Sequence, residues 1–163
     1  MQRIAVFLAA LLVFAGAAGA ATAPKKVSEP EAVILGIYSQ YSPDKWPTDA
    51  EQTTFSPDLW AKWKEVQDAA DAADDVGVDF DVFLDAQDTD TVTDISTKFT
   101  PDGADKGTVE ITFTAFGEKR TIDYAMVKTD KGWKIDNIDW GNDEGNLRET
   151  LAAIRKDQLN PPQ

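Results

Sequence analysis

The chain contains neither cysteine nor histidine in its 163 residues. Without histidine it has no imidazole base and no nitrogen ligand for a metal ion. Without cysteine it has no thiolate nucleophile, no disulfide and no zinc–thiolate site. These absences exclude most common catalytic and metal-binding arrangements, and the sequence alone indicates no specific activity in their place.

Positive charge is also scarce, because 16 Lys and Arg side chains stand against 29 Asp and Glu side chains, for a net charge of −13. A surface this acidic repels nucleic acid and anionic membranes, so we expect neither as a partner. Apolar runs beyond the N-terminal segment are too short to span a bilayer. The composition therefore predicts an acidic domain with no membrane span after its first residues.

The first twenty residues have the layout of a secretory signal peptide. A short positive segment ends at Arg3, residues 4–14 are apolar, and Ala-Gly-Ala at 18–20 provides small residues for cleavage before Ala21. Removal of residues 1–20 changes the net charge from −13 to −14, because Arg3 is their only charged side chain. We expect the mature protein to be periplasmic or secreted, with an uncleaved N-terminal tether as the alternative.

The remaining chain is long enough for one domain with its own core. We predict an exposed leader over residues 21–29, a single α+β domain over 30–159 and a polar tail over 160–163. Ser28 and Glu31 form a capping box that begins a first helix, Ser56 before Pro57 begins a second, and Asn146 caps a last one. The acidic stretch over 76–86 fits a short strand or an irregular turn equally well.

The clearest strand signal is a period of two over residues 108–115, where apolar side chains alternate with Thr and Glu. We predict a hairpin whose two-residue loop is Gly117-Glu118, with the glycine at positive φ. That loop would place Phe113 opposite Ile122, Ile111 opposite Tyr124 and Val109 opposite Met126.

A second turn is predicted at residues 129–132, Thr-Asp-Lys-Gly, as a type I turn closed by a glycine bulge. It would set Ile138 opposite Tyr124 and Trp140 opposite Ile122. Val127, Trp133 and Ile135 would then lie on the other face of the sheet, where the last helix could cover them. A further strand over 92–99 would contribute Ile95, Thr97 and Phe99. Helices before and after an antiparallel meander indicate the α+β class.

Residues 79–88 form an acidic–aromatic run, Asp-Phe-Asp-Val-Phe-Leu-Asp-Ala-Gln-Asp, with two predicted helices before it. The segment Gly-Trp-Lys-Ile-Asp-Asn-Ile follows at 132–138. In these segments the chain resembles exported bacterial proteins of domain of unknown function family 3828. The resemblance covers residues 30 to 155. It implies a nuclear transport factor 2-like, or cystatin-like, cone: a curved sheet wrapped around helices with a pocket at its mouth, and no established activity. The chain departs from this family in two ways that bear on the local turn. Val82 stands where relatives have proline, and the chain has no cysteine where some relatives have one.

The acidic run has two interpretations. In the functional one, Asp81, Asp85, Gln87 and Asp88 converge at the mouth of the cone and hold a polar ligand. In the structural one, which general burial patterns favour, they satisfy backbone groups while neighbouring apolar side chains fill the core.

We predict no metal ion and no cofactor. Residues 88–94 lack the central glycine and terminal glutamate of an EF-hand loop. The second acidic loop, residues 139–145, is better explained as the turn into the last helix, with its acidic side chains near the positive end of that helix.

Two non-catalytic functions from different classes remain. In one, an acidic exported module docks on a basic envelope or secreted protein. In the other, the cone binds a small apolar ligand, with Trp60, Trp63, Tyr124 and Trp140 lining the cavity. A hydrolase or isomerase that uses carboxylates alone is disfavoured, because no spacing singles out a catalytic pair.

Overall fold

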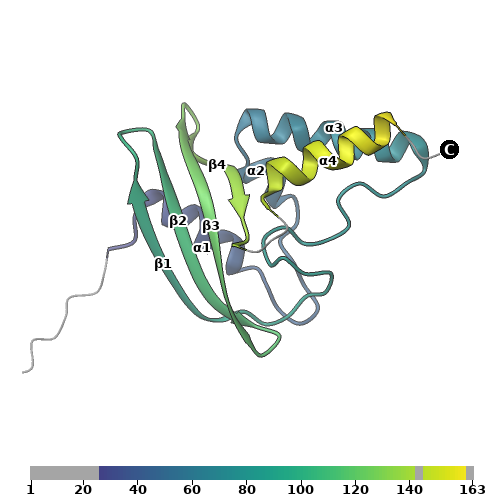
Figure 1. The fold of residues 1–163 in the computed structure, drawn as a ribbon. Coiled ribbons are helices and arrows are strands. Elements are labelled where there is room, and N and C mark those ends of the chain that lie inside the picture. The colour runs from purple at the N-terminus through teal and green to yellow at the C-terminus, as the bar shows by residue number, and fades with distance from the viewer. Residues whose placement is uncertain (1–25, 142–144, 161–163) are drawn as a thin grey trace, which may run out of the picture.

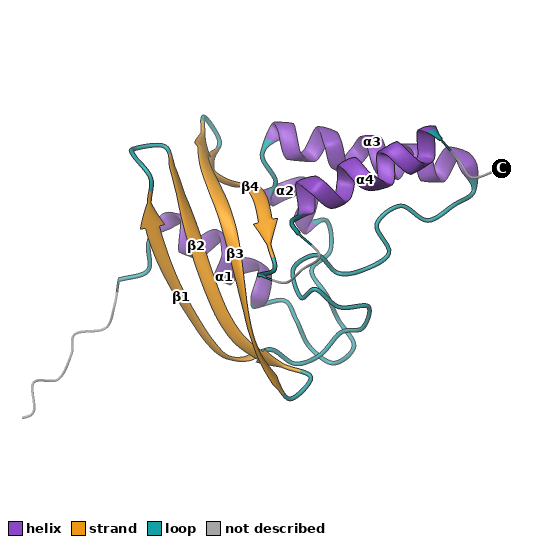
Figure 2. Cartoon of the chain, viewed as in Figure 1, coloured by secondary structure: helices purple, strands orange, loops and turns teal. Residues whose placement is uncertain are grey.

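Four helices and four strands make up the part of the chain that the computed structural model describes, residues 26–141 and 145–160. In chain order they are α1 (Glu29–Tyr38), α2 (Ala50–Thr54), α3 (Pro57–Ala73), β1 (Thr93–Pro101), β2 (Lys106–Ala115), β3 (Glu118–Thr129), β4 (Gly132–Asp139) and α4 (Leu147–Leu159) (Figures 1 and 2). The predicted signal peptide, most of the leader, residues 142–144 of the second acidic loop and residues 161–163 of the tail lie outside the described residues.

The strands form one antiparallel sheet in the order β1-β2-β3-β4, and helices precede and follow it. Helix α1 contacts β1, β2 and β4, so it crosses one face of the sheet, and the long strands β2 and β3 are visibly curved in Figure 2. Helices α3 and α4 lie side by side beyond β4 and run in the same direction (Figure 1). The α+β class predicted from the sequence is confirmed.

The predicted helix starts are confirmed. Ser28 donates to the Glu31 carboxylate from its backbone nitrogen at 2.9 Å and from its hydroxyl at 2.7 Å, which closes the capping box of α1. The Ser56 hydroxyl accepts from the Leu59 backbone nitrogen at 3.1 Å at the start of α3. Helix α1 ends at Tyr38, earlier than the apolar pattern indicates, and α2 was not predicted.

The β2–β3 hairpin has the predicted faces but not the predicted register. Its loop is Phe116-Gly117, with φ values of 55° and 74°, so both central residues are left-handed, as a type I′ turn requires. Val109 therefore lies opposite Tyr124, and Phe113 lies opposite Arg120. The predicted register is wrong by two residues. Because side chains alternate between the two faces of a strand, a shift of two leaves every apolar side chain on its predicted face.

The β3–β4 pairing contains a bulge that the sequence analysis placed elsewhere. Thr129 pairs with Gly132 at the turn and Tyr124 pairs with Ile138 as predicted, but Asp136 is an extra residue on β4 between these pairs. The extra residue rotates the start of the strand, so Ile135 and Trp133 lie on the core side and their predicted position on the opposite face is wrong. Ile135 is fully buried.

Strand β1 forms an edge of the sheet and is irregular at its start. Its pairing with β2 shifts between Thr93 and Ser96, and Asp94 between them has a φ of 52°. Ile95, next to this irregularity, is an exposed apolar side chain, whereas Phe99 further along the strand packs against the core. From Thr97 onward the pairing with β2 is regular up to Pro101.

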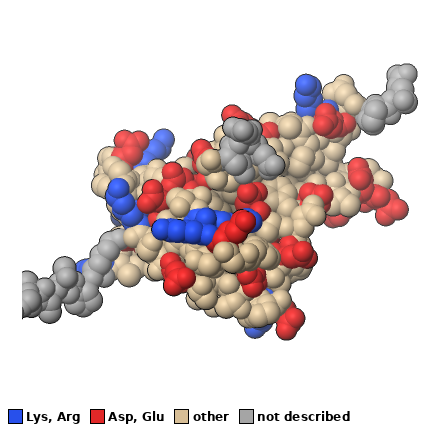
Figure 3. Space-filling model, turned by 60° about the horizontal axis from the view of Figure 1, so that its bottom comes forward, with Lys and Arg blue, Asp and Glu red and all other residues tan. Residues whose placement is uncertain are grey.

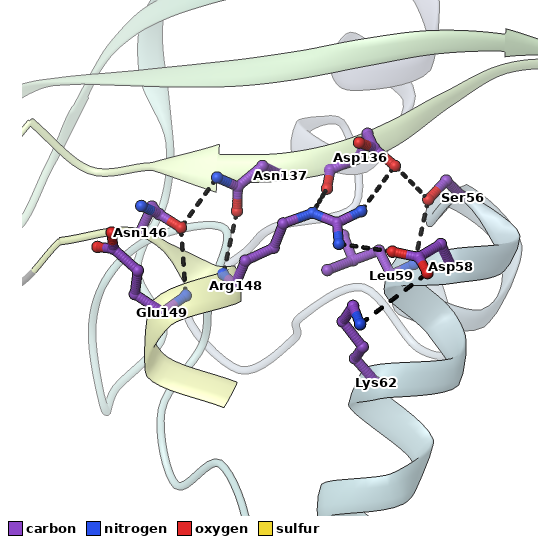
Figure 4. Close-up of polar contacts among 9 residues, drawn as sticks. All are labelled: Ser56, Asp58, Leu59, Lys62, Asp136, Asn137, Asn146, Arg148 and Glu149. Atoms are coloured by element: carbon purple, nitrogen blue, oxygen red, sulfur yellow. Dashed lines mark hydrogen bonds and ion pairs between the residues drawn. The ribbon is translucent and has the colours of Figure 1, made fainter. Parts of the chain in front are cut away.

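The bulge residue Asp136 connects β4 with both long helices (Figure 4). Its carboxylate accepts from the Ser56 hydroxyl at 2.7 Å and from the Arg148 guanidinium at 2.8 Å, and its carbonyl accepts from Nε of Arg148 at 2.6 Å. Arg148 also pairs with Asp58 on α3 at 2.6 Å, and this hydrogen bond lowers the pKa of Asp58. A single arginine thus joins α4 to α3 and β4.

None of the helices in the described ranges is long and apolar enough to cross a membrane.

Gly117→Val should destabilise the domain by about 1–3 kcal/mol, because a β-branched side chain is strained at a φ of 74° in the hairpin loop. The matched control is Gly36→Ala on the exposed face of α1, where an added methyl group meets no neighbouring atom. That variant should gain about 0.5–1 kcal/mol from helix propensity. Urea unfolding of both variants measures the two effects, and an unchanged midpoint for Gly117→Val would contradict the loop assignment.

Candidate functional site

Residues 81–86 form an irregular turn that is inserted into the core, and we call it the plug. Backbone hydrogen bonds between Asp81 and Ala86 close it, at 2.7 and 3.4 Å. Between them, Val82, Phe83 and Leu84 are at most 1% exposed. The interior that the sequence analysis expected to hold a ligand is therefore filled by the chain itself at this point.

The carbonyl groups of the plug are satisfied by side chains of the core. The Phe83 carbonyl accepts from the Tyr38 hydroxyl at 2.5 Å and from the Tyr124 hydroxyl at 3.3 Å, and the two hydroxyls lie 2.9 Å apart. The Val82 carbonyl accepts from the indole nitrogen of Trp140 at 2.9 Å. Tyr124 and Trp140 thus hold the plug from within the packed core.

Asp81 holds the plug from its outer side. One carboxylate oxygen accepts from the backbone nitrogens of Phe83 and Leu84 at 2.8 and 3.3 Å, and the other accepts from the Tyr41 hydroxyl at 2.6 Å. Three donors on one carboxylate account for an aspartate that is only partly exposed next to apolar side chains. Asp81 thus satisfies backbone groups, as the structural interpretation of the acidic run expects.

Arg120 of β3 fastens the end of the plug to the sheet. Its guanidinium donates to the carbonyls of Leu84 and Asp85, both at 2.9 Å. The same guanidinium lies 5.5 Å from the centre of the Phe116 ring in the hairpin loop. The plug and the β2–β3 turn are therefore linked through one side chain.

A cleft opens beside the plug, between α2, α3 and the segment that leads into the plug. Its volume is about 450 Å³. Four aromatic and four acidic side chains line it, and we call it the aromatic–acidic cleft: Trp46, Trp63, Phe80, Phe83, Asp49, Glu51, Asp79 and Asp81. The other lining residues are Pro47, Thr48, Val78 and Gln87, so the lining contains no lysine or arginine.

The aromatic walls of the cleft differ in how firmly they are held. Trp63 packs edge-on against Phe55 with ring centres 5.7 Å apart, and Phe80 packs edge-on against Trp140 at 5.5 Å. Both walls are therefore fixed by the core. Trp46 is 56% exposed and comes from the loop between α1 and α2, so its ring is the outermost aromatic surface of the cleft.

Glu51 lies in the first turn of α2 and lines the cleft. Burial raises the pKa of its carboxyl group, and the nearby negative charges of Asp81 and Asp49 raise it further, against the lowering effect of a backbone hydrogen bond. A carboxylate that is partly desolvated beside other carboxylates lacks a countercharge. The cleft can therefore gain free energy by taking up positive charge.

The eight residues proposed from the sequence do not come together in one site. Trp63, Asp81 and Gln87 line the aromatic–acidic cleft. Tyr124 and Trp140 lie in the core, where they bind the plug. The remaining three do not line the cleft: Trp60, Asp85 and Asp88.

Sequence reasoning missed Trp46, Asp49, Glu51 and Phe80 as cleft residues. Trp46 belongs to no helical or strand period, and a tryptophan in a loop next to proline was the available signal. Nothing in the sequence could bring α2 against the plug, because only the tertiary fold places residues 46–51 beside residues 78–81.

Comparison with known proteins gives one distant likeness. A solved structure described as the phospholipid-binding protein from Ralstonia solanacearum in complex with a phospholipid is similar at 17% sequence identity and a TM-score of 0.33. The match covers 77% of this chain and 58% of that one, so the chain spans less than two thirds of that protein. No family model matches the chain, and no curated protein is similar to it. The resemblance to domain of unknown function family 3828 stays a prediction.

Asp81→Ala should lower the free energy of unfolding by about 1–3 kcal/mol, because two buried backbone nitrogens and the Tyr41 hydroxyl lose their acceptor. Asp88→Ala is the matched control, since Asp88 is exposed in the same run. Its effect should stay within about 0.5 kcal/mol. Equal effects of the two substitutions in urea unfolding would contradict the structural role of Asp81.

All three tyrosines of the chain should titrate only when the domain unfolds. Burial raises the pKa of Tyr38, Tyr41 and Tyr124, and neighbouring acidic groups raise it further, while the hydrogen bond with Tyr38 offsets part of the rise for Tyr124. A raised folded-state pKa means that stability is complete below the unfolded value of about 10 and is lost as pH rises above it. Absorbance at 295 nm should therefore rise in one step that coincides with loss of circular dichroism. A tyrosine that ionises near pH 10 in the folded domain would contradict this packing.

Proposed function

We propose that the protein is an exported, non-catalytic binding module that captures a small amphipathic ligand in the aromatic–acidic cleft. The observation that carries this proposal is the combination, in one concave site of about 450 Å³, of aromatic walls with carboxylates. Concave sites with apolar walls and a few convergent polar groups are the usual geometry of ligand binding.

The arrangement of the cleft defines the ligand in outline. Trp63 and Phe80 are fixed by core contacts, so they offer a preformed surface to an apolar or aromatic group. Asp49 and Glu51 stand at the α2 side and accept hydrogen bonds from a polar end group. A ligand with one apolar part and one donor-bearing end satisfies both sides.

The signal peptide predicted over residues 1–20 supports the exported location, and the resemblance noted above supports the bacterial envelope as the compartment. A non-catalytic role is supported by the way Asp81 is used. Its carboxylate is already engaged by Tyr41 and two backbone nitrogens, which ties it to holding the plug.

A basic protein partner is the second candidate, because the net charge of −13 favours association with positive surfaces. On the face drawn in Figure 3, acidic side chains are spread over the surface with basic ones among them. That distribution favours the cleft over one acidic docking patch on this face. Docking by charge should weaken steeply with salt, whereas capture of an uncharged ligand should respond little.

Trp46→Ala should weaken binding of the uncharged fluorescent probe N-phenyl-1-naphthylamine to the mature protein by about tenfold, because it removes the outermost aromatic wall. The probe's fluorescence enhancement at several protein concentrations gives the dissociation constant. Trp46 is exposed, so the loss of stability should be small.

Leu159→Ala is the matched control, since Leu159 is exposed at the end of α4 and does not line the cleft. It should bind the probe like the unaltered protein. Equal affinity of the Trp46 variant and the control, or a dissociation constant that rises steeply between low and high salt, would contradict ligand capture in the cleft.

A further inference from the structure

We propose that the aromatic–acidic cleft selects an organic cation, a primary amine or quaternary ammonium group carried on an apolar body, over neutral and anionic ligands of the same shape. This inference rests on the proposed function and specifies the ligand class of the same site.

The first argument is charge. Four carboxylates line the cleft, at Asp49, Glu51, Asp79 and Asp81, and no lysine or arginine is among its lining residues. Asp81 accepts three hydrogen bonds, but none of its donors is cationic, so its negative charge is not neutralised. An anionic ligand would meet like charge on several sides, and a cation would meet its countercharges.

The second argument is the aromatic lining. Trp46, Trp63 and Phe80 line the same cavity as the carboxylates. A cation held against the face of such a ring is attracted by its quadrupole, by roughly 0.5–2 kcal/mol depending on exposure, and tryptophan gives the strongest attraction. An uncharged group of the same size gains only the contact area. Rings and carboxylates therefore favour the same kind of ligand.

The third argument separates an organic cation from a metal ion. Within residues 26–141 and 145–160, no group of three or more acidic side chains is placed to hold a metal ion. The cleft carboxylates are thus not grouped as a coordination shell, which needs several oxygen atoms within roughly 2.0–2.6 Å of one ion. A cation with an apolar body can instead fill a cavity of about 450 Å³ and reach acidic groups at its edge.

Three probes that share a phenyl ring and a two-carbon chain test the selectivity: 2-phenylethylammonium, 2-phenylethanol and phenylacetate. Their affinities for the mature protein are measured at pH 7 by calorimetry and by quenching of tryptophan fluorescence. We expect the ammonium to bind at least tenfold more tightly than the alcohol, which corresponds to about 1.4 kcal/mol. Phenylacetate should bind most weakly.

Charge removal inside the cleft is compared with equal charge removal elsewhere. The double variant Asp49→Asn, Glu51→Gln keeps the shape of both side chains, and asparagine tolerates the left-handed backbone of Asp49. It should lose about tenfold in ammonium affinity and leave the alcohol unchanged. The control double variant Asp71→Asn, Asp102→Asn changes the net charge equally at exposed positions outside the cleft, and should bind both probes normally.

The pH dependence gives a second readout. Burial raises the pKa of Glu51, and the nearby charges of Asp81 and Asp49 raise it further, against a backbone hydrogen bond that lowers it. The Tyr41 hydroxyl also lies within electrostatic reach of Glu51. As pH falls through that raised pKa, Glu51 takes up a proton and the cleft loses one negative charge. Ammonium affinity should therefore fall on acidification, while affinity for 2-phenylethanol should stay level. The Glu51→Gln variant should lose this dependence.

The outcomes distinguish this inference from the proposed function. If N-phenyl-1-naphthylamine binds and the ammonium binds no better than the alcohol, the cation selectivity is overturned and ligand capture stands. If the ammonium is preferred equally by the cleft variant and the control variant, the preference comes from overall charge and the inference is overturned. If neither the naphthylamine nor the ammonium binds, both proposals fall together.

Discussion

The structure depends on the hydrogen bonding of an irregular turn in the middle of the core. Burying a side chain such as Phe83 or Leu84 stabilises a fold by about 1.5–3 kcal/mol, while each buried carbonyl left without a donor costs about 1–3 kcal/mol. The plug is favourable because Tyr38, Tyr124 and Trp140 supply donors to its Phe83 and Val82 carbonyls. Aromatic residues that bring both apolar area and a polar atom are therefore needed at these positions.

That requirement also explains where a ligand can bind. Because the plug fills the interior of the fold, the aromatic rings around it are committed to holding it, and an open concave surface lies at its flank. The cleft uses the plug as one wall through Asp81 and Phe83, and the other walls come from α3 and from the segment around α2. The stability of the turn and the shape of the cleft are thus set by the same residues.

The sequence predicted the parts of the fold that depend on local pattern. Alternation over residues 108–115 predicted which face of β2 is buried, and the capping residues predicted where the helices begin. The predicted register of the β2–β3 hairpin was wrong because the backbone conformation of one residue decides it. Nothing in the sequence marks Phe116 as left-handed. The spacing of Ile135 and Ile138 required the bulge at Asp136, because both are buried at an odd separation on one strand. The cleft could not be predicted, because Trp46 and Glu51 reach it only through the tertiary fold.

Strand β1 lies at one end of the sheet, and its sequence makes that edge a poor template for other chains. Near one end of β1, the left-handed Asp94 interrupts the regular row of backbone groups. Pro101 lies at the other end of the strand, and Lys98 lies between them. Charged residues, prolines and bulges on outer strands oppose intermolecular β-pairing. The opposite edge is shielded, because Ser56 donates to the Ile135 carbonyl at 2.7 Å. The sheet is thereby protected against fibril-like self-association without any covalent crosslink.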